Sequence, residues 1–205
     1  MEQLPMRARS LMNRRAVIGG LASLIWPSAV GAQMPPLQDD PPELRTARSQ
    51  FIIVAGGGVL SPVNVERMDG KRIDLSSFRG RVVLLSFWAT WCPPCRREVP
   101  QLEQLQAMLR GEKIEIVAVS IDRSGTSVVK PFLDRLGVRK LTPYLDPGGQ
   151  LTQAQGPDAR PLFRLYGMPI SYIIDRHGRV AGYFSGEMDW TSPAALRLLR
   201  YYADP

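Results

Sequence analysis

Both cysteines of this 205-residue chain lie in one Cys-x-x-Cys sequence, Cys92 to Cys95. Residues 81–88 before them are almost continuously apolar, which predicts a buried strand, and residues 94–109 carry apolar side chains at helical spacing. The pair therefore falls where a strand ends and a helix begins. The free N–H groups and partial positive charge of a helix start favour the thiolate of the first cysteine. Such a thiolate can attack a disulfide, and the second cysteine can resolve the mixed disulfide that forms.

The N-terminus predicts that this chemistry takes place outside the cytoplasm. Residues 1–15 are basic, residues 16–32 are apolar and uncharged, and the segment ends in small residues, which is the order of an export signal. The Arg14-Arg15 pair resembles a twin-arginine signal. The apolar segment is short for a membrane span and contains Pro27, so an uncleaved anchor is the alternative. In either case we expect a periplasmic domain, soluble or held by residues 1–32.

Three other interpretations of the cysteine pair are weaker. A metal site needs more ligands, and the single histidine, His177, falls in an expected hairpin turn, so we predict no metal. A structural disulfide closing so short a loop gains little chain entropy. Two unpaired thiols do not suit an oxidising compartment. A redox-active pair is therefore the preferred interpretation.

Charge excludes another class of function. The formal net charge is +7, but residues 1–32 hold four Arg and one Glu, which leaves +4 for the rest. Basic pairs such as Arg96-Arg97 lack interleaved aromatic residues, so we expect solvated surface and no nucleic-acid binding. The 44% of hydrophobic residues is enough for a folded core. We expect a monomer without a cofactor.

The elements that must position the cysteines form one domain, residues 51–205, after a Pro-rich spacer at 33–50. The expected strands are 63–66, 71–74, 81–88, 114–121, 141–145, 171–175 and 179–185, and the expected helices are 94–109, 127–136 and 193–202. Asp69-Gly70 predicts a hairpin turn, and Ser192 predicts a helix cap. Residues 147–164 are irregular, with a short helix expected near 162–165. This order predicts an α/β fold, a mixed sheet flanked by helices.

The motif also carries a family resemblance. Residues 86–100, Ser-Phe-Trp-Ala-Thr-Trp-Cys-Pro-Pro-Cys-Arg-Arg-Glu-Val-Pro, closely resemble the thioredoxin superfamily, and within it the exported TlpA/ResA/CcmG-type thiol–disulfide reductases. A second segment, Gly167 to Ser171, resembles the cis-proline loop of that family. The similarity covers roughly residues 59–202 and is strongest to the TlpA branch, which also shares features of residues 187–190. It implies a thioredoxin-like mixed sheet with an N-terminal hairpin extension.

The resemblance also implies roles for individual residues. Cys92 is the attacking thiol, Cys95 resolves, and the two form the redox-active disulfide. The substrate-binding residues implied are Trp91, Pro93, Met168, Pro169 and Ile170, with Pro169 in the cis form. In many relatives a threonine stands at the position of Ile170.

Glu98 follows Cys95 by three residues and shares its helix face. Reductases of the family often have an acid there, which implies proton exchange with Cys95. The alternative is a capping or surface glutamate. Ser86 stands where cytosolic thioredoxins carry a buried Asp, and this shifts proton handling toward Glu98 or water.

The resemblance predicts an exported reductase of specific protein disulfides in cytochrome c or cytochrome oxidase copper-site maturation. Apocytochrome c or copper-site assembly proteins are the expected substrates, and a membrane thiol reductant of DsbD/CcdA type is the expected electron donor. Two alternatives stay open. One is a periplasmic disulfide-forming oxidase, and the other is a Cu(I)-binding metallochaperone that uses Cys92 and Cys95, because soft thiolates suit that ion.

Overall fold

The computed structural model describes residues 40–157 and 159–204. The predicted export segment, 1–32, and the first part of the predicted spacer lie outside them. Within the described residues the strands are β1 (Phe51–Ile53), β2 (Asn64–Arg67), β3 (Arg72–Asp74), β4 (Val82–Trp88), β5 (Ile114–Ser120), β6 (Pro143–Leu145), β7 (Ile170–Ile174) and β8 (Val180–Ser185). The helices are the 3₁₀ turn η1 (Leu75–Phe78) and the α-helices α1 (Pro93–Met108), α2 (Thr126–Leu136) and α3 (Pro193–Ala203).

These strands form one mixed sheet in the order β1-β8-β7-β4-β5-β6-β2-β3. β4 pairs in parallel with β5, and β5 with β6, whereas every other neighbouring pair is antiparallel. All seven residues of β4 are buried, as its nearly continuous apolar sequence predicts. The strand that leads to the cysteines is thus fixed on both sides and on both faces.

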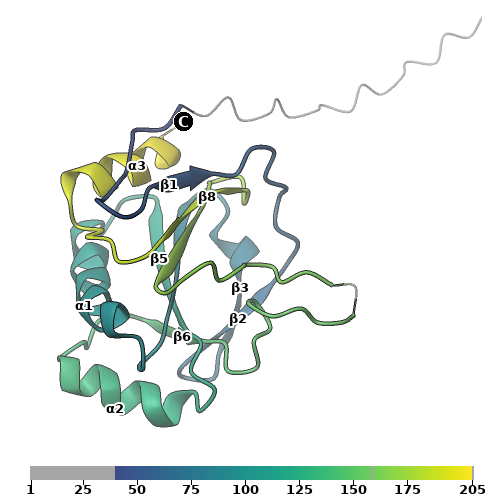
Figure 1. Cartoon of the computed structure of the whole chain (residues 1–205), viewed down its shortest axis with the longest axis vertical. Helices are drawn as coiled ribbons and strands as arrows, with labels where there is room; N and C mark the ends of the chain where they lie inside the picture. The colour runs from purple at the N-terminus through teal and green to yellow at the C-terminus, as the bar shows by residue number, and fades with distance from the viewer. Residues whose placement is uncertain (1–39, 158, 205) are drawn as a thin grey trace, which may run out of the picture. The chain divides into compact units, whose positions relative to one another are not determined.

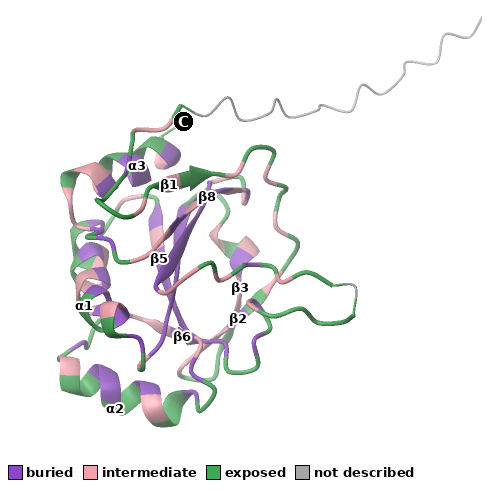
Figure 2. Ribbon diagram, viewed as in Figure 1, coloured by how far each residue is buried: buried purple, intermediate pink, exposed green. Residues whose placement is uncertain are grey.

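The two faces of the sheet carry separate hydrophobic clusters. Val82 and Leu84 of β4 join the cluster that contains the buried residues of α1, α2 and α3, while Val83 and Leu85 face a second cluster built with residues of loops and of the β2–β3 region. Figure 1 shows the three α-helices along one side of the sheet, and Figure 2 shows the buried residues concentrated in the central strands. This alternation follows from the two-residue period of a strand.

The N-terminal hairpin extension is confirmed. Val65 of β2 pairs with Ile73 of β3, and the turn between the strands contains Gly70 at a φ of 83°. A positive φ suits glycine, which explains the Asp-Gly turn signal. β2 also pairs with β6, so the hairpin extends the edge of the sheet.

The structure differs from the expected spacer at residues 33–50, because the end of this segment packs on the domain. Leu44 is 1% exposed within the helix-side cluster. Arg45 and Gln50 form an isolated β-bridge, and the hydroxyl of Ser49 donates to the carbonyl oxygen of Ser185 at 2.6 Å. The chain then enters β1, which pairs with β8. One apolar side chain and this strand pairing hold the segment in place, although its composition is that of a linker.

The short helix expected near residues 162–165 is wrong. The segment is irregular, and Phe163, 1% exposed, packs its ring 5.6 Å from Phe87 and 5.0 Å from Tyr172. Its N–H donates to the carbonyl oxygen of Leu151 at 2.9 Å. Aromatic burial, and not local helix formation, decides the conformation here. In the part of the chain that the structure describes, no helix is both long and apolar enough to cross a membrane.

Candidate active site

The two cysteines form a disulfide at the start of α1, with an S–S distance of 2.08 Å. Cys92 is the N-cap of the helix, and the N–H of Cys95 points at the Cys92 sulfur, 3.3 Å away. Pro93 and Pro94 occupy the first helical positions, where their missing N–H groups cost nothing. The helix therefore presents its first available N–H to Cys92, which stabilises a thiolate on that sulfur when the disulfide opens.

Burial separates the roles of the two sulfurs. Cys95 is 0% exposed and Cys92 is 3% exposed, next to Trp91, which is 64% exposed. Pro93 is exposed as well. Cys92 thus keeps a small exposed surface beside an aromatic side chain, while Cys95 keeps none. This geometry suits attack by Cys92 and resolution by Cys95.

A buried carboxylate fixes the turn that precedes Cys92. Asp122 is 4% exposed and accepts from the backbone N–H of Thr90 at 2.9 Å and from its hydroxyl at 2.7 Å. The hydroxyl of Ser120 donates to the same carboxylate at 2.8 Å. Asp122 was not among the predicted site residues. It comes from the end of β5, which lies beside β4 in the sheet, and only this pairing brings it to Thr90.

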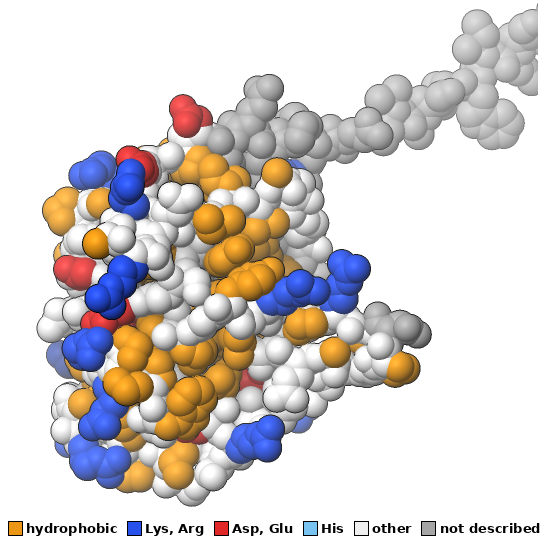
Figure 3. Space-filling view, in the orientation of Figure 1, with side chains coloured by type: hydrophobic (Ala, Val, Ile, Leu, Met, Phe, Trp, Pro, Cys, Tyr) orange, Lys and Arg blue, Asp and Glu red, His pale blue; other side chains and the backbone are white. Residues whose placement is uncertain are grey.

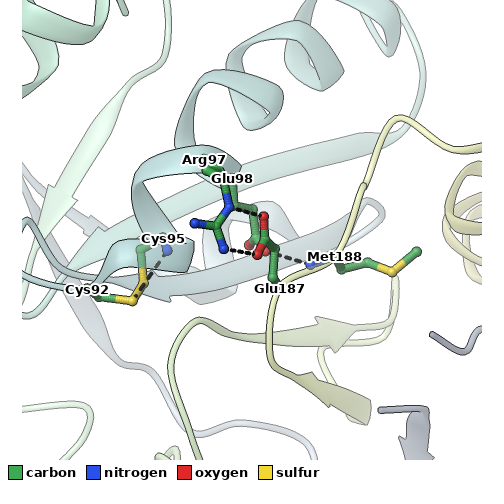
Figure 4. Close-up of polar contacts among 6 residues, drawn as sticks. All are labelled: Cys92, Cys95, Arg97, Glu98, Glu187 and Met188. Atoms are coloured by element: carbon green, nitrogen blue, oxygen red, sulfur yellow. Dashed lines mark hydrogen bonds and ion pairs between the residues drawn. A yellow bond between two sulfur atoms is a disulfide. The ribbon is translucent and has the colours of Figure 1, made fainter. Parts of the chain in front are cut away.

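Glu98 lies on α1 one turn after Cys95, and it is neither a cap nor a surface residue because it is 1% exposed. Its Oε2 accepts from the backbone N–H of Met188 at 2.9 Å (Figure 4). Its Oε1 accepts from the Ser86 hydroxyl at 3.4 Å. The position where cytosolic thioredoxins carry a buried Asp thus holds a hydroxyl that contacts Glu98.

Burial raises the pKa of Glu98 from its ordinary value of 4.5 to about 8. The hydrogen bonds from Met188 and Ser86 oppose this rise because they favour the charged form. The indole of Trp190 also lowers the pKa of Glu98, although its N–H makes no contact of hydrogen-bond geometry. The nearby negative charge of Glu187 raises it. Glu98 is therefore a carboxyl group that can exchange a proton near neutral pH.

An ion pair covers this buried group from outside. Arg97 donates through Nε to Oε1 of Glu187 at 2.7 Å and through Nη2 to Oε2 (Figure 4). Arg97 and Glu187 are the sequence neighbours of Glu98 and Met188, so two adjacent contacts join α1 to the loop after β8. The partners stand 90 residues apart. No local pattern in the sequence indicates that they meet.

The predicted cis-proline loop lies beside the helix start. The Met168–Pro169 bond is cis, as the resemblance implies, and the Pro169 carbonyl accepts from the N–H of Gly186 at 2.8 Å. Met168 and Pro94 line one groove of about 660 Å³. The other residues lining it are Thr46, Ala47, Arg48, Ser49, Arg97, Gly186 and Glu187.

Ile170 is placed differently from the prediction. Its side chain is 0% exposed within the second hydrophobic cluster, and its backbone pairs with Phe87 and Ser185 in the sheet. The side chain therefore has no surface to offer a substrate. Among the described residues, no group of three or more His, Cys, Asp or Glu side chains could hold a metal ion.

Comparison with known proteins agrees with this geometry. The model of the family described as Redoxin matches residues 29–199, which is more than half of the chain. The chain belongs to the Redoxin family. It is 32% identical over 123 residues to "Thiol-disulfide oxidoreductase ResA" of Bacillus thuringiensis subsp. konkukian (strain 97-27), covering 60% of this chain and 65% of that protein. To the protein of the same name from Geobacillus thermodenitrificans (strain NG80-2) it is 31% identical over 135 residues, covering 66% of this chain and 72% of the relative.

A solved structure shows the same fold. The structure of a putative thiol:disulfide interchange protein DsbE from Chlorobium tepidum matches with a TM-score of 0.59 and 30% identity, covering 72% of this chain and 97% of that one. The predicted thioredoxin-like α/β fold is confirmed by this likeness. Similarity to the TlpA branch in particular stays a prediction.

Proposed function

We propose that this Redoxin-family chain is an exported thiol–disulfide oxidoreductase that reduces disulfides in other proteins. The observation that carries the proposal is the Cys92–Cys95 disulfide at the start of α1, with the buried carboxyl group of Glu98 one turn further along the same helix. The relatives named ResA and the structure titled DsbE support the same chemistry.

The reaction consists of two exchanges. In the reduced protein the Cys92 thiolate attacks one sulfur of the acceptor disulfide, which forms a mixed disulfide and releases the first acceptor thiolate. The Cys95 thiolate then attacks the Cys92 sulfur, which releases the second acceptor thiolate and forms Cys92–Cys95. Two electrons pass from the Cys92/Cys95 dithiol to the acceptor. A dithiol donor must then reduce the protein for another cycle.

Glu98 serves Cys95 in the second exchange. Cys95 must lose its proton before it attacks, and it is enclosed, so water is a poor acceptor. Glu98 shares the helix face of Cys95, and because its pKa is raised to about 8 it can take up or release a proton near neutral pH. We assign Glu98 the proton that Cys95 gives up during oxidation and regains during reduction.

The surroundings of the sulfurs favour the reducing direction. A strongly oxidising pair needs a highly stabilised thiolate. Here Cys92 accepts one backbone N–H, while the neighbouring Arg97 is bound to Glu187 and Arg96 lies over the Phe132 ring at 5.9 Å. Little therefore stabilises the reduced form, and the dithiol gives up its electrons readily.

Substrates, location and domain organisation follow as parts of the proposal. We assign residues 1–32 to export or anchoring, and the reaction to the periplasm. The acceptors are apocytochrome c or copper-site assembly proteins, and the donor is a membrane thiol reductant of DsbD/CcdA type. Trp91, Pro93 and Met168 form the surface for the acceptor, and the buried Pro169 supports it through the cis bond that it forms with Met168. The alternatives are a disulfide-forming oxidase and a Cu(I) carrier that uses the same two thiols.

Trapping the intermediate tests the proposed function. Reduced full-length chain is mixed with a peptide that contains one disulfide, and products are separated without reductant. We expect C95S to accumulate a mixed disulfide at Cys92 in a 1:1 ratio, the unaltered chain to release reduced peptide, and C92S to do neither. Equal trapping by C92S would reverse the assigned roles, and no reduction by the unaltered chain would overturn the proposal.

A further inference from the structure

Charge is distributed unequally around the Cys92–Cys95 disulfide. On the side of the loop after β8, Arg97 is neutralised by Glu187. On the side of α2, three exposed arginines make no ion pair with any described residue: Arg96, Arg123 and Arg135. Figure 3 shows Lys and Arg side chains gathered over α2, with few Asp or Glu side chains among them.

Two of these arginines border a groove between α1 and α2, which we name the α1/α2 groove. It has a volume of about 350 Å³ and is lined by Thr90, Trp91, Arg96, Ser127, Val128, Pro131, Phe132 and Arg135. The guanidinium of Arg96 lies over the Phe132 ring, 5.9 Å from its centroid, which directs the side chain toward α2. The exposed Trp91, the sequence neighbour of Cys92, is among the lining residues. The groove is thus partly apolar and bordered by cations.

A second groove adjoins the α1/α2 groove and is also lined by an unpaired arginine. Its volume is about 570 Å³, and Trp91 and Val128 line both grooves, with Arg123 on the rim of the second. Its two carboxylates, Asp122 and Asp146, are each 4% exposed and hydrogen-bonded to the protein. Both are almost fully buried, so the exposed charge on this surface is the positive charge of Arg123.

We propose that the α1/α2 groove and the adjoining surface around Arg123 dock an acidic segment of the partner protein next to the disulfide being exchanged. The proposal rests on the proposed function and deepens it by naming the chemistry of the acceptor. Unpaired cations beside a reacting centre raise the encounter rate with an oppositely charged partner by ten- to a thousandfold in known cases. Trp91 and the apolar floor supply the contact that holds the docked segment.

Two disulfide peptides of equal length, one flanked by Asp and Glu and one flanked by Lys, test this surface. Single-turnover rates are measured with the reduced full-length chain at low and high salt, and bis(2-hydroxyethyl) disulfide serves as the neutral substrate. At low salt we expect the acidic peptide to react at least tenfold faster than the basic one, and this preference should shrink at high salt.

The R123E/R135E variant should lower the rate with the acidic peptide at least tenfold and leave the rate with the neutral disulfide unchanged. The matched control is R110E, which makes the same kind of charge reversal at an exposed arginine just beyond the far end of α1. Equal rates for the two peptides, or equal losses in R110E and R123E/R135E, would overturn the inference.

Direct binding separates this inference from the proposed function. An acidic peptide with its cysteines replaced by serine should bind the oxidised chain and quench or shift tryptophan fluorescence, and the R123E/R135E variant should lose this binding. Failure to reduce the neutral disulfide overturns the proposed function alone. Failure of the acidic peptide to bind overturns the docking surface alone.

Discussion

Asp122 shows how one buried side chain can hold the redox turn in place. Its carboxylate takes both donors of Thr90 and the hydroxyl of Ser120, and Thr90 is two residues before Cys92. Replacing Asp122 by Ala leaves three donors without this acceptor, the Ser120 hydroxyl in a buried position and the two Thr90 donors in a half-buried one. A buried polar group left unpaired costs about 1–3 kcal/mol.

We therefore expect D122A to lower the free energy of unfolding by about 3 kcal/mol, measured by urea denaturation of the oxidised chain. The rate of disulfide reduction should fall as well, because the turn that carries Trp91 and Cys92 loses its anchor. T90V, which removes the hydroxyl bond alone, should cost about 1 kcal/mol. Equal stability of D122A and the unaltered chain would contradict this role.

At the scale of elements, the contact between α1 and the loop after β8 is a pair of adjacent interactions. The outer one is the Arg97–Glu187 ion pair, and the inner one is the bond from the Met188 N–H to Glu98. R97Q removes the outer interaction. It loosens the loop that holds the Met188 donor and leaves the charge of Glu187 uncompensated, and both effects disfavour the charged form of Glu98.

The expected result is an upward shift of the pKa of Glu98 by up to about one unit, the equivalent of one weakened hydrogen bond to a charged group. The shift should appear in the pH dependence of the disulfide-reduction rate. R200Q is a matched control, because Arg200 binds both carboxylate oxygens of Glu112, away from the cysteines. A profile for R97Q that is identical to that for R200Q would show that the ion pair does not position Glu98.

Local sequence patterns predicted the elements well where one signal dominates. The buried strand β4, the Gly70 turn and the Ser192 cap each follow from a few adjacent residues. The cysteine motif and the cis-proline loop also stand in continuous sequence. These parts of the site could be found without a structure.

The rest depends on contacts between distant segments. The Arg97–Glu187 pair joins residues 90 positions apart, and Asp122 reaches Thr90 only through pairing of β4 with β5. Leu44 lies in a proline-rich segment, and its burial depends on a surface that the finished domain provides. Proline content and polarity describe the local chain, but they carry no information on such a surface.

At the scale of the whole molecule, Glu98 links stability to pH. Its pKa is about 8 in the folded chain and near 4.5 when unfolded, so between these values the folded state holds a proton that the unfolded state has released. The free energy of unfolding should therefore fall as pH rises from about 4.5 to about 8. The loss by pH 7 amounts to roughly 3 kcal/mol.

E98Q removes this titration. Its stability relative to the unaltered chain should increase steadily between pH 5 and pH 8, as measured by thermal or urea unfolding of both oxidised proteins at matched pH. Parallel pH curves for the two proteins would mean that the carboxyl group of Glu98 does not keep its proton in the folded state.

The equilibrium reduction potential of the Cys92–Cys95 pair tests the central claim most directly. The full-length chain is equilibrated with glutathione and dithiothreitol buffers, and the fraction of dithiol is followed by tryptophan fluorescence and thiol trapping. Because few groups stabilise the Cys92 thiolate, we predict a potential near or below about −250 mV, in the range of reducing thioredoxin-like pairs. A value near about −120 mV would identify a disulfide-forming oxidase and contradict the direction of electron flow proposed here.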